Sequence, residues 1–234
     1  MKNPLVLLLL PLLFFQACSF CVEGEGPLVI EERITENFDA IVVKGSADVL
    51  LVHSTSPFVE VTAQESLLEM IETRVEGSTL IVSIDGCYRS REALSIRAGI
   101  HHPVLVKVSG SGSIKGEEAL ETEEIEIQVD GSGDIILHLN AGFVNAVVRG
   151  SGDILLEGAC DVFEAGVKGS GDIKAEALLA KKVTATVNGS GDARVNATES
   201  LEAKINGSGD IRYAGNPEDL ETRVNGSGDI RKLR

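Results

Sequence analysis

Six aspartates recur at almost equal intervals in the second half of this 234-residue chain, each at the end of the tetrapeptide Gly-Ser-Gly-Asp. A variant, Gly-Ser-Gly-Ser, begins at Gly110, and successive tetrapeptides begin 21, 19, 19, 20, 18 and 19 residues apart. Periodic carboxylates in glycine-rich repeats can bind calcium, or they can fix a turn by hydrogen bonding to its backbone. The six aspartates are Asp134, Asp153, Asp172, Asp192, Asp210 and Asp229.

The geometry of a stack weighs against calcium. Stacked carboxylates about 5 Å apart repel each other by roughly 1 kcal/mol even in water, so something must offset that repulsion. Calcium takes about six to eight oxygen ligands, and one carboxylate per repeat falls short of that number. We therefore predict no metal site. We expect the glycine and serine amides of the corner to hold the carboxylates, with help from Arg149, Lys168 and a column of Asn188, Asn206 and Asn225.

Other reactive residues are few, and they do not form a catalytic pattern. The chain has four histidines and no tryptophan, and aromatic residues make up 4% of it. We predict no catalytic residue and no cofactor. The stretch from Gly86 to Pro103 interrupts the repeat and gathers Tyr88, two arginines and the pair His101-His102. It is the best candidate for a binding loop, and an ordinary solvated insertion is the alternative.

The elements that position these corners are strands. Val144, Ala146 and Val148 precede the corner at Gly150, and Ile154 and Leu156 follow it. Apolar residues at every second position indicate a strand with one buried face. A strand, a corner and a strand repeated at a fixed period predict an all-β fold, a single parallel β-helix or solenoid with coils about 4.8 Å apart and right-handed crossovers.

The first half of the chain carries the same unit in a less regular form. Residues 41–51 and 71–84 each place a glycine and a serine between two alternating apolar stretches, with further candidate strands at 58–63 and 93–98. A short helical turn is expected around residues 65–73. We predict one domain over residues 31–234 with about nine coils of roughly 19–33 residues, longer and irregular in 31–109 and regular in 110–234.

The N-terminus has the features of a targeting segment. Lys2 is followed by an apolar run from Leu5 to Phe15, too short to span a membrane, and Ala17 precedes Cys18. We predict a signal peptide over residues 1–17, lipidation of Cys18, and an acidic tether over residues 18–30. An ordinary secretory signal that ends near a cysteine is the alternative. Lipidation would make the protein a lipoprotein of the bacterial cell envelope, in the outer membrane.

The remaining cysteines are odd in number if Cys18 is acylated. Cys21, Cys87 and Cys160 are 66 and 73 residues apart, which matches no metal-ligand spacing. No complete disulfide framework is implied, and the pairing of these three residues stays open. Cys160 is expected in a return loop as a small buried thiol.

The chain resembles a known family, the head domain of bacterial auto-transporter adhesins, called the GIN domain. The resemblance runs from about Arg33 to the C-terminus and is carried by residues 38–49 and 71–82 and by the series ending in Gly207-Ser-Gly-Asp-Ile-Arg-Tyr-Ala-Gly-Asn-Pro217. It implies a β-strand solenoid on a cell-envelope lipoprotein, and it supplies no catalytic residues.

The net charge of −15 limits the possible partners. Binding to phosphate backbones needs a basic stripe, so nucleic acid is excluded as a partner. We expect attachment to a membrane through a lipid anchor and a protein or glycan ligand, and the oligomeric state stays open. The function predicted is a non-catalytic binding, adhesin-like or structural module. The alternatives are a carbohydrate-active β-helix enzyme and a subunit of an envelope-stress or assembly complex.

The first prediction tests the anchor. Changing Cys18→Ser removes the residue that would be acylated, so we expect the protein to leave the membrane fraction, because the apolar run before it is cleaved off. Fractionation of cells expressing either form measures this. A variant that stays in the membrane fraction contradicts the lipid anchor.

Overall fold

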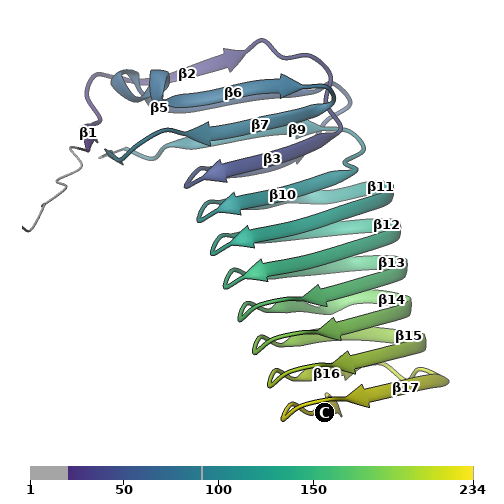
Figure 1. The fold of residues 1–234 in the computed structure, drawn as a ribbon. Helices are drawn as coiled ribbons and strands as arrows, with labels where there is room; N and C mark the ends of the chain where they lie inside the picture. The colour runs from purple at the N-terminus through teal and green to yellow at the C-terminus, as the bar shows by residue number, and fades with distance from the viewer. Residues whose placement is uncertain (1–20, 91, 234) are drawn as a thin grey trace, which may run out of the picture.

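The protein is a flattened two-sided β-solenoid whose coils stack along one axis (Figure 1). The computed structural model describes residues 21–90 and 92–233. Five long strands form the regular part, each pairing in parallel with the next in sequence and bending halfway along its length (Figure 1). They are β11 (Ser113–Gly131), β12 (Asp134–Gly150), β13 (Ile154–Val167), β14 (Ile173–Val187) and β15 (Ala193–Ile205).

The bends divide the solenoid into two flanks. The first flank holds the strand halves that follow a Gly-Ser-Gly-Asp corner, and the second flank holds the halves that precede one. At the C-terminal end the two halves are separate strands: β16 (Ile211–Ala214) and β18 (Ile230–Lys232) continue the first flank, and β17 (Asp219–Val224) continues the second. The predicted parallel solenoid is thereby confirmed.

The core is the narrow space between the two flanks. The alternation seen in the sequence is largely the alternation of burial: Val144, Ala146 and Val148 are fully buried, whereas Asn145 is half buried and Arg149 is exposed. Phe163 of β13 is the largest fully buried side chain. Because each coil is only two strands thick, the inward residues of the two flanks form a single core cluster along the solenoid.

One coil of the first half joins the regular stack. Strand β3 (Ala40–Gly45) pairs in parallel with β10 (Leu105–Gly110), and β4 (Asp48–His53) pairs in parallel with β11. Gly45 therefore lies in register with Gly110 and Gly131. The prediction that residues 41–51 form a corner between two strands is confirmed.

The unit predicted around Gly77 is not a coil. Strands β6 (Ile71–Glu76) and β7 (Thr79–Ile84) form an antiparallel hairpin, and Gly77, with φ of +64°, lies in its two-residue turn. The solenoid consequently has about seven turns rather than the nine expected. A glycine with serine suits a hairpin turn as well as a solenoid corner, which is why the motif alone misled.

Antiparallel strands also close the N-terminal end. The two extra strands expected in the first half are present as β5 (Phe58–Gln64) and β9 (Ser95–Ile100), and the expected helical turn is the 3-10 helix η1 (Glu65–Met70). Strand β5 pairs antiparallel with β9 on one side and with β2 (Leu28–Arg33) on the other. This arrangement covers the end of the stack that lies opposite the C-terminus (Figure 1).

The segment before β2 is also structured. Residues 21–30, which the sequence assigns to the tether, lie in β1 (Val22–Glu23), in the connection after it, and in the start of β2. Strand β1 pairs in parallel with β8 (Tyr88–Arg89). The expected signal peptide and Cys18 lie outside the described residues. Within the described ranges, no helix has the length and apolar character needed to cross a membrane.

The corner glycines are required by the close approach of successive coils. A Cβ built on Gly171 would lie 1.9 Å from the carbonyl oxygen of Gly152, and the same distance separates a Cβ on Gly152 from the carbonyl oxygen of Gly133. No side chain fits there, since contacts of that length are forbidden by sterics. At Gly171 the requirement is this contact with the neighbouring backbone and not a left-handed φ.

The second prediction follows from that contact. Gly171→Val should lower the free energy of unfolding by about 2–4 kcal/mol, because the clash is with the backbone of the preceding corner, Ser151 and Gly152. Gly166→Ala is the matched control, since a Cβ there would meet its nearest atom, in the Val147 side chain, at 3.6 Å. Chemical denaturation measures both. Equal stability of the two variants would contradict the steric explanation.

Candidate functional site

The six corner aspartates form a hydrogen-bonded ladder along one edge of the solenoid. From the second aspartate onward, each backbone N–H donates to Oδ1 of the aspartate one coil earlier: Asp153 to Asp134 at 2.8 Å and Asp172 to Asp153 at 2.9 Å. The same bond continues from Asp192 to Asp172, from Asp210 to Asp192 and from Asp229 to Asp210, at 2.8, 2.8 and 2.9 Å. Each carboxylate therefore stabilises the stacking of the next coil.

The glycine and serine amides do not hold the carboxylates, contrary to the expectation from the sequence. They donate instead to the first glycine of the preceding corner: N–H groups of Ser132 and Gly133 lie 2.8 and 3.0 Å from the carbonyl oxygen of Gly110. The asparagine column forms a second ladder, in which Nδ2 of Asn206 donates to Oδ1 of Asn188 at 2.7 Å. The hydrogen bonds of the corner backbone, of the aspartates and of the asparagines are thus all made between neighbouring coils.

Cations two residues after three of the corners, rather than before them, form ion pairs with the aspartate column: Lys174, Arg212 and Arg231. Nζ of Lys174 lies 2.5 Å from Oδ2 of Asp153, and Arg212 lies 3.5 Å from Asp192 and 3.1 Å from Asp210. Arg231 adds a second contact of 3.1 Å to Asp210. Arg149, which the sequence placed near the column, pairs with Asp130 instead, at 3.1 Å.

These contacts shift the acidity of the groups involved. The N–H of Asp229, followed by Arg231 and Arg212, holds the pKa of Asp210 below its ordinary value of 3.8, against the effect of partial burial. The hydrogen bond to Asp153 raises the pKa of Lys174. Both shifts favour the charged forms that make the contacts.

Three histidines come together beside the first flank, near the N-terminal end. The ring centroids of His101 and His102 are 3.8 Å apart, and that of His53 lies 5.5 Å from that of His101. Burial, followed by the neighbouring His102 and His53, lowers the pKa of His101. Nevertheless, no group of three His, Cys, Asp or Glu side chains within residues 21–90 and 92–233 has the geometry of a metal site.

The predicted binding loop, Gly86 to Pro103, is divided between two structural roles. Its central part is β9, whose residues Ile96, Ala98 and Ile100 are fully buried. Its first part contains β8 and Cys87, which is joined to Cys21 by a disulfide. The structure therefore places the part from Ile96 to Ile100 largely inside the fold, whereas the described residues before it are exposed or half buried.

The edge opposite the corners carries an open groove, which we call the edge groove. It has a volume of about 410 Å³ and runs over the bends of four successive coils, β12 to β15. An ion pair of 2.6 Å between Lys181 and Asp161 lies along it, and Leu179 is 50% exposed there. The lining residues are Asn140, Ala141, Ala159, Cys160, Asp161, Leu179, Ala180, Lys181, Thr198 and Glu199.

Cys160 contributes a thiol to the edge groove without being reactive. It lies within β13 rather than in the loop expected from the sequence, it is buried as expected, and it forms no disulfide. Burial, helped by the charge of Asp161, raises its pKa to about 12. The thiol is therefore protonated at neutral pH and acts as a small apolar side chain.

Sequence reasoning missed the edge groove and the disulfide. The groove is built from small residues at the bends, such as Ala141, Ala159 and Ala180, which give no motif. The disulfide joins residues 66 positions apart, and only the fold brings them together. Three cysteines remain after Cys18, and this odd number gave no indication of a pair. The structure accounts for them as one disulfide, Cys21–Cys87, and one buried thiol, Cys160.

The stacked parallel coils and their self-satisfied corners define a β-solenoid module whose recurring acids serve the architecture. The chain belongs to the family described as "Putative auto-transporter adhesin, head GIN domain", which matches residues 37–217. The resemblance seen in the sequence is thereby confirmed. The family supports a binding or adhesin-like module of the cell envelope or surface.

Solved structures agree with this assignment. A "putative adhesin" from Bacteroides fragilis is 26% identical with a TM-score of 0.83, covering 91% of this chain and 100% of that chain. A "putative lipid binding protein" from Parabacteroides distasonis is 28% identical with a TM-score of 0.74, covering 92% of this chain and 100% of that chain. Among the curated proteins, no relative matches the chain.

The third prediction concerns calcium. Because backbone N–H groups and cations already satisfy the aspartate ladder, the melting temperature should not change with millimolar calcium or with chelator. Asp172→Asn should change the free energy of unfolding by less than about 1 kcal/mol, since the amide oxygen still accepts the bond from Asp192. Thermal unfolding measures both. A melting temperature that rises with calcium, and no longer does so in Asp172→Asn, would identify a metal site.

The fourth prediction concerns acid. The pKa of Asp210 is lower in the folded protein than its ordinary value of 3.8, so its contribution to stability is present above about pH 4 and is lost as the pH falls below that value. Asp210→Asn should therefore make the loss of stability in acid less steep. The control is Asp219→Asn, because no side-chain hydrogen bond or ion pair within the described ranges involves Asp219. Equal acid profiles of the two variants, measured by denaturant unfolding, would refute this role.

Proposed function

We propose that this protein is a lipid-anchored module of the bacterial cell envelope that binds a protein or glycan partner through the edge groove and performs no catalysis. The observation that carries the proposal is the edge groove itself, an open channel with an apolar floor that crosses four coils. Membership of the adhesin head-domain family supports a binding role.

The edge groove suits an extended protein segment better than a sugar. Its floor is apolar, formed by Ala141, Cys160 and Ala180, and its rim carries the Asp161–Lys181 ion pair. Sugars are commonly held by stacking on aromatic rings, and no aromatic side chain is among the residues that line this groove. Leu179, half exposed at the surface, offers the apolar contact that a protein partner would bury.

The acidities support binding rather than glycoside hydrolysis. A general acid needs a raised pKa, whereas the carboxyl groups of residues 21–90 and 92–233 with a clearly shifted pKa have it lowered. A hydrogen bond from Arg74 lowers the pKa of Glu76, and backbone and arginine contacts lower that of Asp210. For Asp130, partial burial acts upward, but hydrogen bonds from Lys107 and Arg149 prevail and lower the pKa. These lowered pKa values, in the part of the chain that the structure describes, favour binding over glycoside hydrolysis.

The name of one structural neighbour raises a second candidate ligand. That protein is described as a "putative lipid binding protein", and an apolar floor also suits an acyl chain. Sites for small ligands usually bury most of the ligand surface. The edge groove is open along its length, with Leu179 half exposed, so a single acyl chain would stay largely in water. We therefore favour a larger partner.

The location rests on the sequence and on the family. Ala17-Cys18 ends an apolar run typical of lipoprotein signals. The net charge of −15 suits a particle held at a membrane by acyl chains rather than by attraction to anionic lipid. Together these features support an outer-membrane lipoprotein.

The fifth prediction tests the edge groove. Leu179→Glu puts a charge on the exposed apolar residue of the groove, so it should weaken partner binding at least about tenfold, as expected when a buried contact worth more than about 1.4 kcal/mol is lost. The measurement is cross-linking in intact envelope followed by titration of the captured partner against each purified variant.

The matched control is Ile136→Glu, which changes an apolar residue of similar exposure, 39% against 50%, on the first flank. The control should bind like the original protein, because Ile136 does not line the groove. Equal loss in both variants would show that the edge groove is not the contact surface. If the captured partner is a component of an envelope-stress or assembly complex, the protein is a subunit of that complex.

A further inference from the structure

We propose that the solenoid stands end-on at the membrane, with its N-terminal cap against the surface of a zwitterionic phospholipid bilayer and its C-terminal coils directed away. The N-terminal cap is the part formed by β1, β2, η1 and β8. This inference rests on the lipid anchor at Cys18 proposed above, and it assigns the cap a contact surface that the anchor alone does not define.

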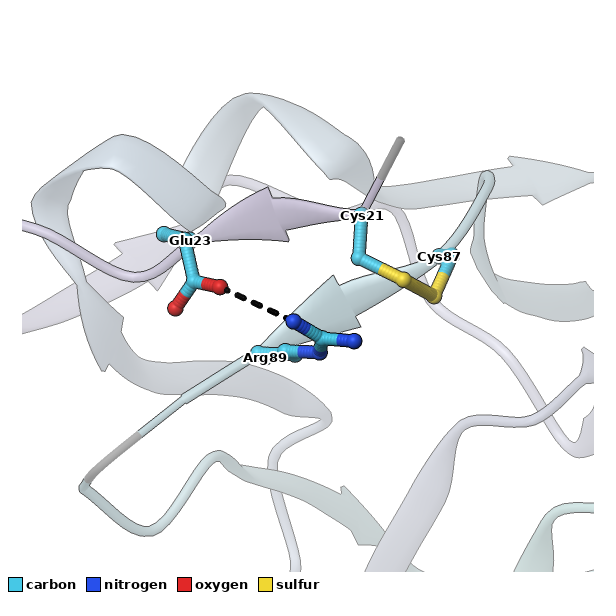
Figure 2. The surroundings of a disulfide bond; sticks show 4 residues. All are labelled: Cys21, Glu23, Cys87 and Arg89. Atoms are coloured by element: carbon cyan, nitrogen blue, oxygen red, sulfur yellow. Dashed lines mark hydrogen bonds and ion pairs between the residues drawn. A yellow bond between two sulfur atoms is a disulfide. The ribbon is translucent and has the colours of Figure 1, made fainter. Parts of the chain in front are cut away.

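The disulfide fixes the chain to the cap at Cys21, the first residue that the structure describes. Cys21 is bonded to Cys87, and β1 pairs with β8 directly after it (Figure 2). The N–H of Val22 donates to the carbonyl oxygen of Cys87 at 2.9 Å, and an ion pair of 3.4 Å joins Glu23 to Arg89. The chain is therefore fixed to the cap from Cys21 onward.

Hydrogen bonds also hold the residues that follow β1 against the cap. The N–H of Glu25 donates to Oγ of Ser66 in η1 at 2.7 Å, and the N–H of Glu65 donates to the carbonyl oxygen of Pro27 at 3.1 Å. From Leu28 to Arg33 the chain pairs with β5 without interruption. The acidic segment expected to act as a tether is thus part of the cap.

The length of chain left for a tether is therefore short. Cys21 lies three positions after Cys18, a reach of at most about 11 Å, whereas a chain free up to Leu28 would reach about 35 Å. By comparison, the described first flank runs through eleven strands from β2 to β18, roughly 50 Å at about 4.8 Å per strand. Acyl chains on Cys18 would hold the cap, and no other part of the solenoid, next to the bilayer.

The surface of the cap suits that contact. Nine large apolar residues of the described chain are exposed, and four of them lie in β1, in β2 or directly after β2: Val22, Leu28, Ile30 and Ile34. Leu28 and Ile30, 48% and 66% exposed, alternate on one face of the edge strand β2, and Ile34 follows as a fully exposed side chain. Apolar side chains of this kind bind at the boundary between headgroups and acyl chains. The neighbouring Glu23 and Glu25 favour a zwitterionic surface over an anionic one.

The experiment uses tryptophan fluorescence, since the chain contains no tryptophan. Ile30→Trp places the probe on the cap, and Leu220→Trp places it on an exposed position of β17 in the last coil. The mature chain is coupled through Cys18 to a maleimide phospholipid in phosphatidylcholine vesicles, because Cys160 is buried and Cys21 is bonded to Cys87. Lipids with a spin label on the headgroup then quench any probe that lies at the surface.

We expect several-fold stronger quenching of Ile30→Trp than of Leu220→Trp, and a smaller difference in vesicles rich in anionic lipid. Equal quenching at both positions, or none at either, overturns the end-on arrangement. The chemical anchor makes this result independent of acylation in the cell, which fractionation of the Cys18→Ser variant tests separately. The failure of either proposal is thus recognised on its own.

A second variant tests the part assigned to the disulfide. Replacing both Cys21→Ser and Cys87→Ser lengthens the free chain, so the difference in quenching between the two probe positions should shrink while the thermal transition of the solenoid body remains. An unchanged difference would show that the bridge does not set the distance between cap and membrane.

Discussion

The structure depends on one steric constraint, the contact between the backbones of successive corners. A carbonyl oxygen of one coil lies where the Cβ of the next would be, so both corner glycines are required in every coil from Gly110 onward. The contact brings the coils close enough for the amides of Ser and Gly to bond to the preceding corner, and for each Asp N–H to reach the preceding carboxylate. Register, ladder and charge pairing all follow from that approach.

The regular half of the fold could be predicted from the sequence because its signals are local and repeated. Period-two apolar residues on either side of Gly150 specify two strands and their buried faces, and the constant interval specifies stacking. The first half could not be read in the same way. Gly77-Ser78 has the same composition as a corner, and whether it turns into a hairpin or a coil depends on which strand accepts β7, a long-range choice that the motif does not contain.

In the candidate site, too, the local features could be predicted from the sequence and the long-range contacts could not. That the aspartates are structural could be argued from charge repulsion and ligand number, but their partners could not, since the N–H that binds Asp153 comes from the next coil and the ammonium group from Lys174. The edge groove was not predictable, because alanines at bends carry no chemical signal until stacking aligns them. Likewise, the Cys21–Cys87 pair became visible only when β1 was placed beside β8.

The aspartate ladder has a further consequence for how such a molecule can change its size. Each aspartate from Asp153 to Asp229 makes the same backbone bond to the coil before it, so a whole repeat could be inserted or deleted without altering this bond in the others. Gene duplication in units of about 19 residues would then lengthen the solenoid by one strand spacing, about 4.8 Å, at a time. The number of repeats thus sets the length of the solenoid.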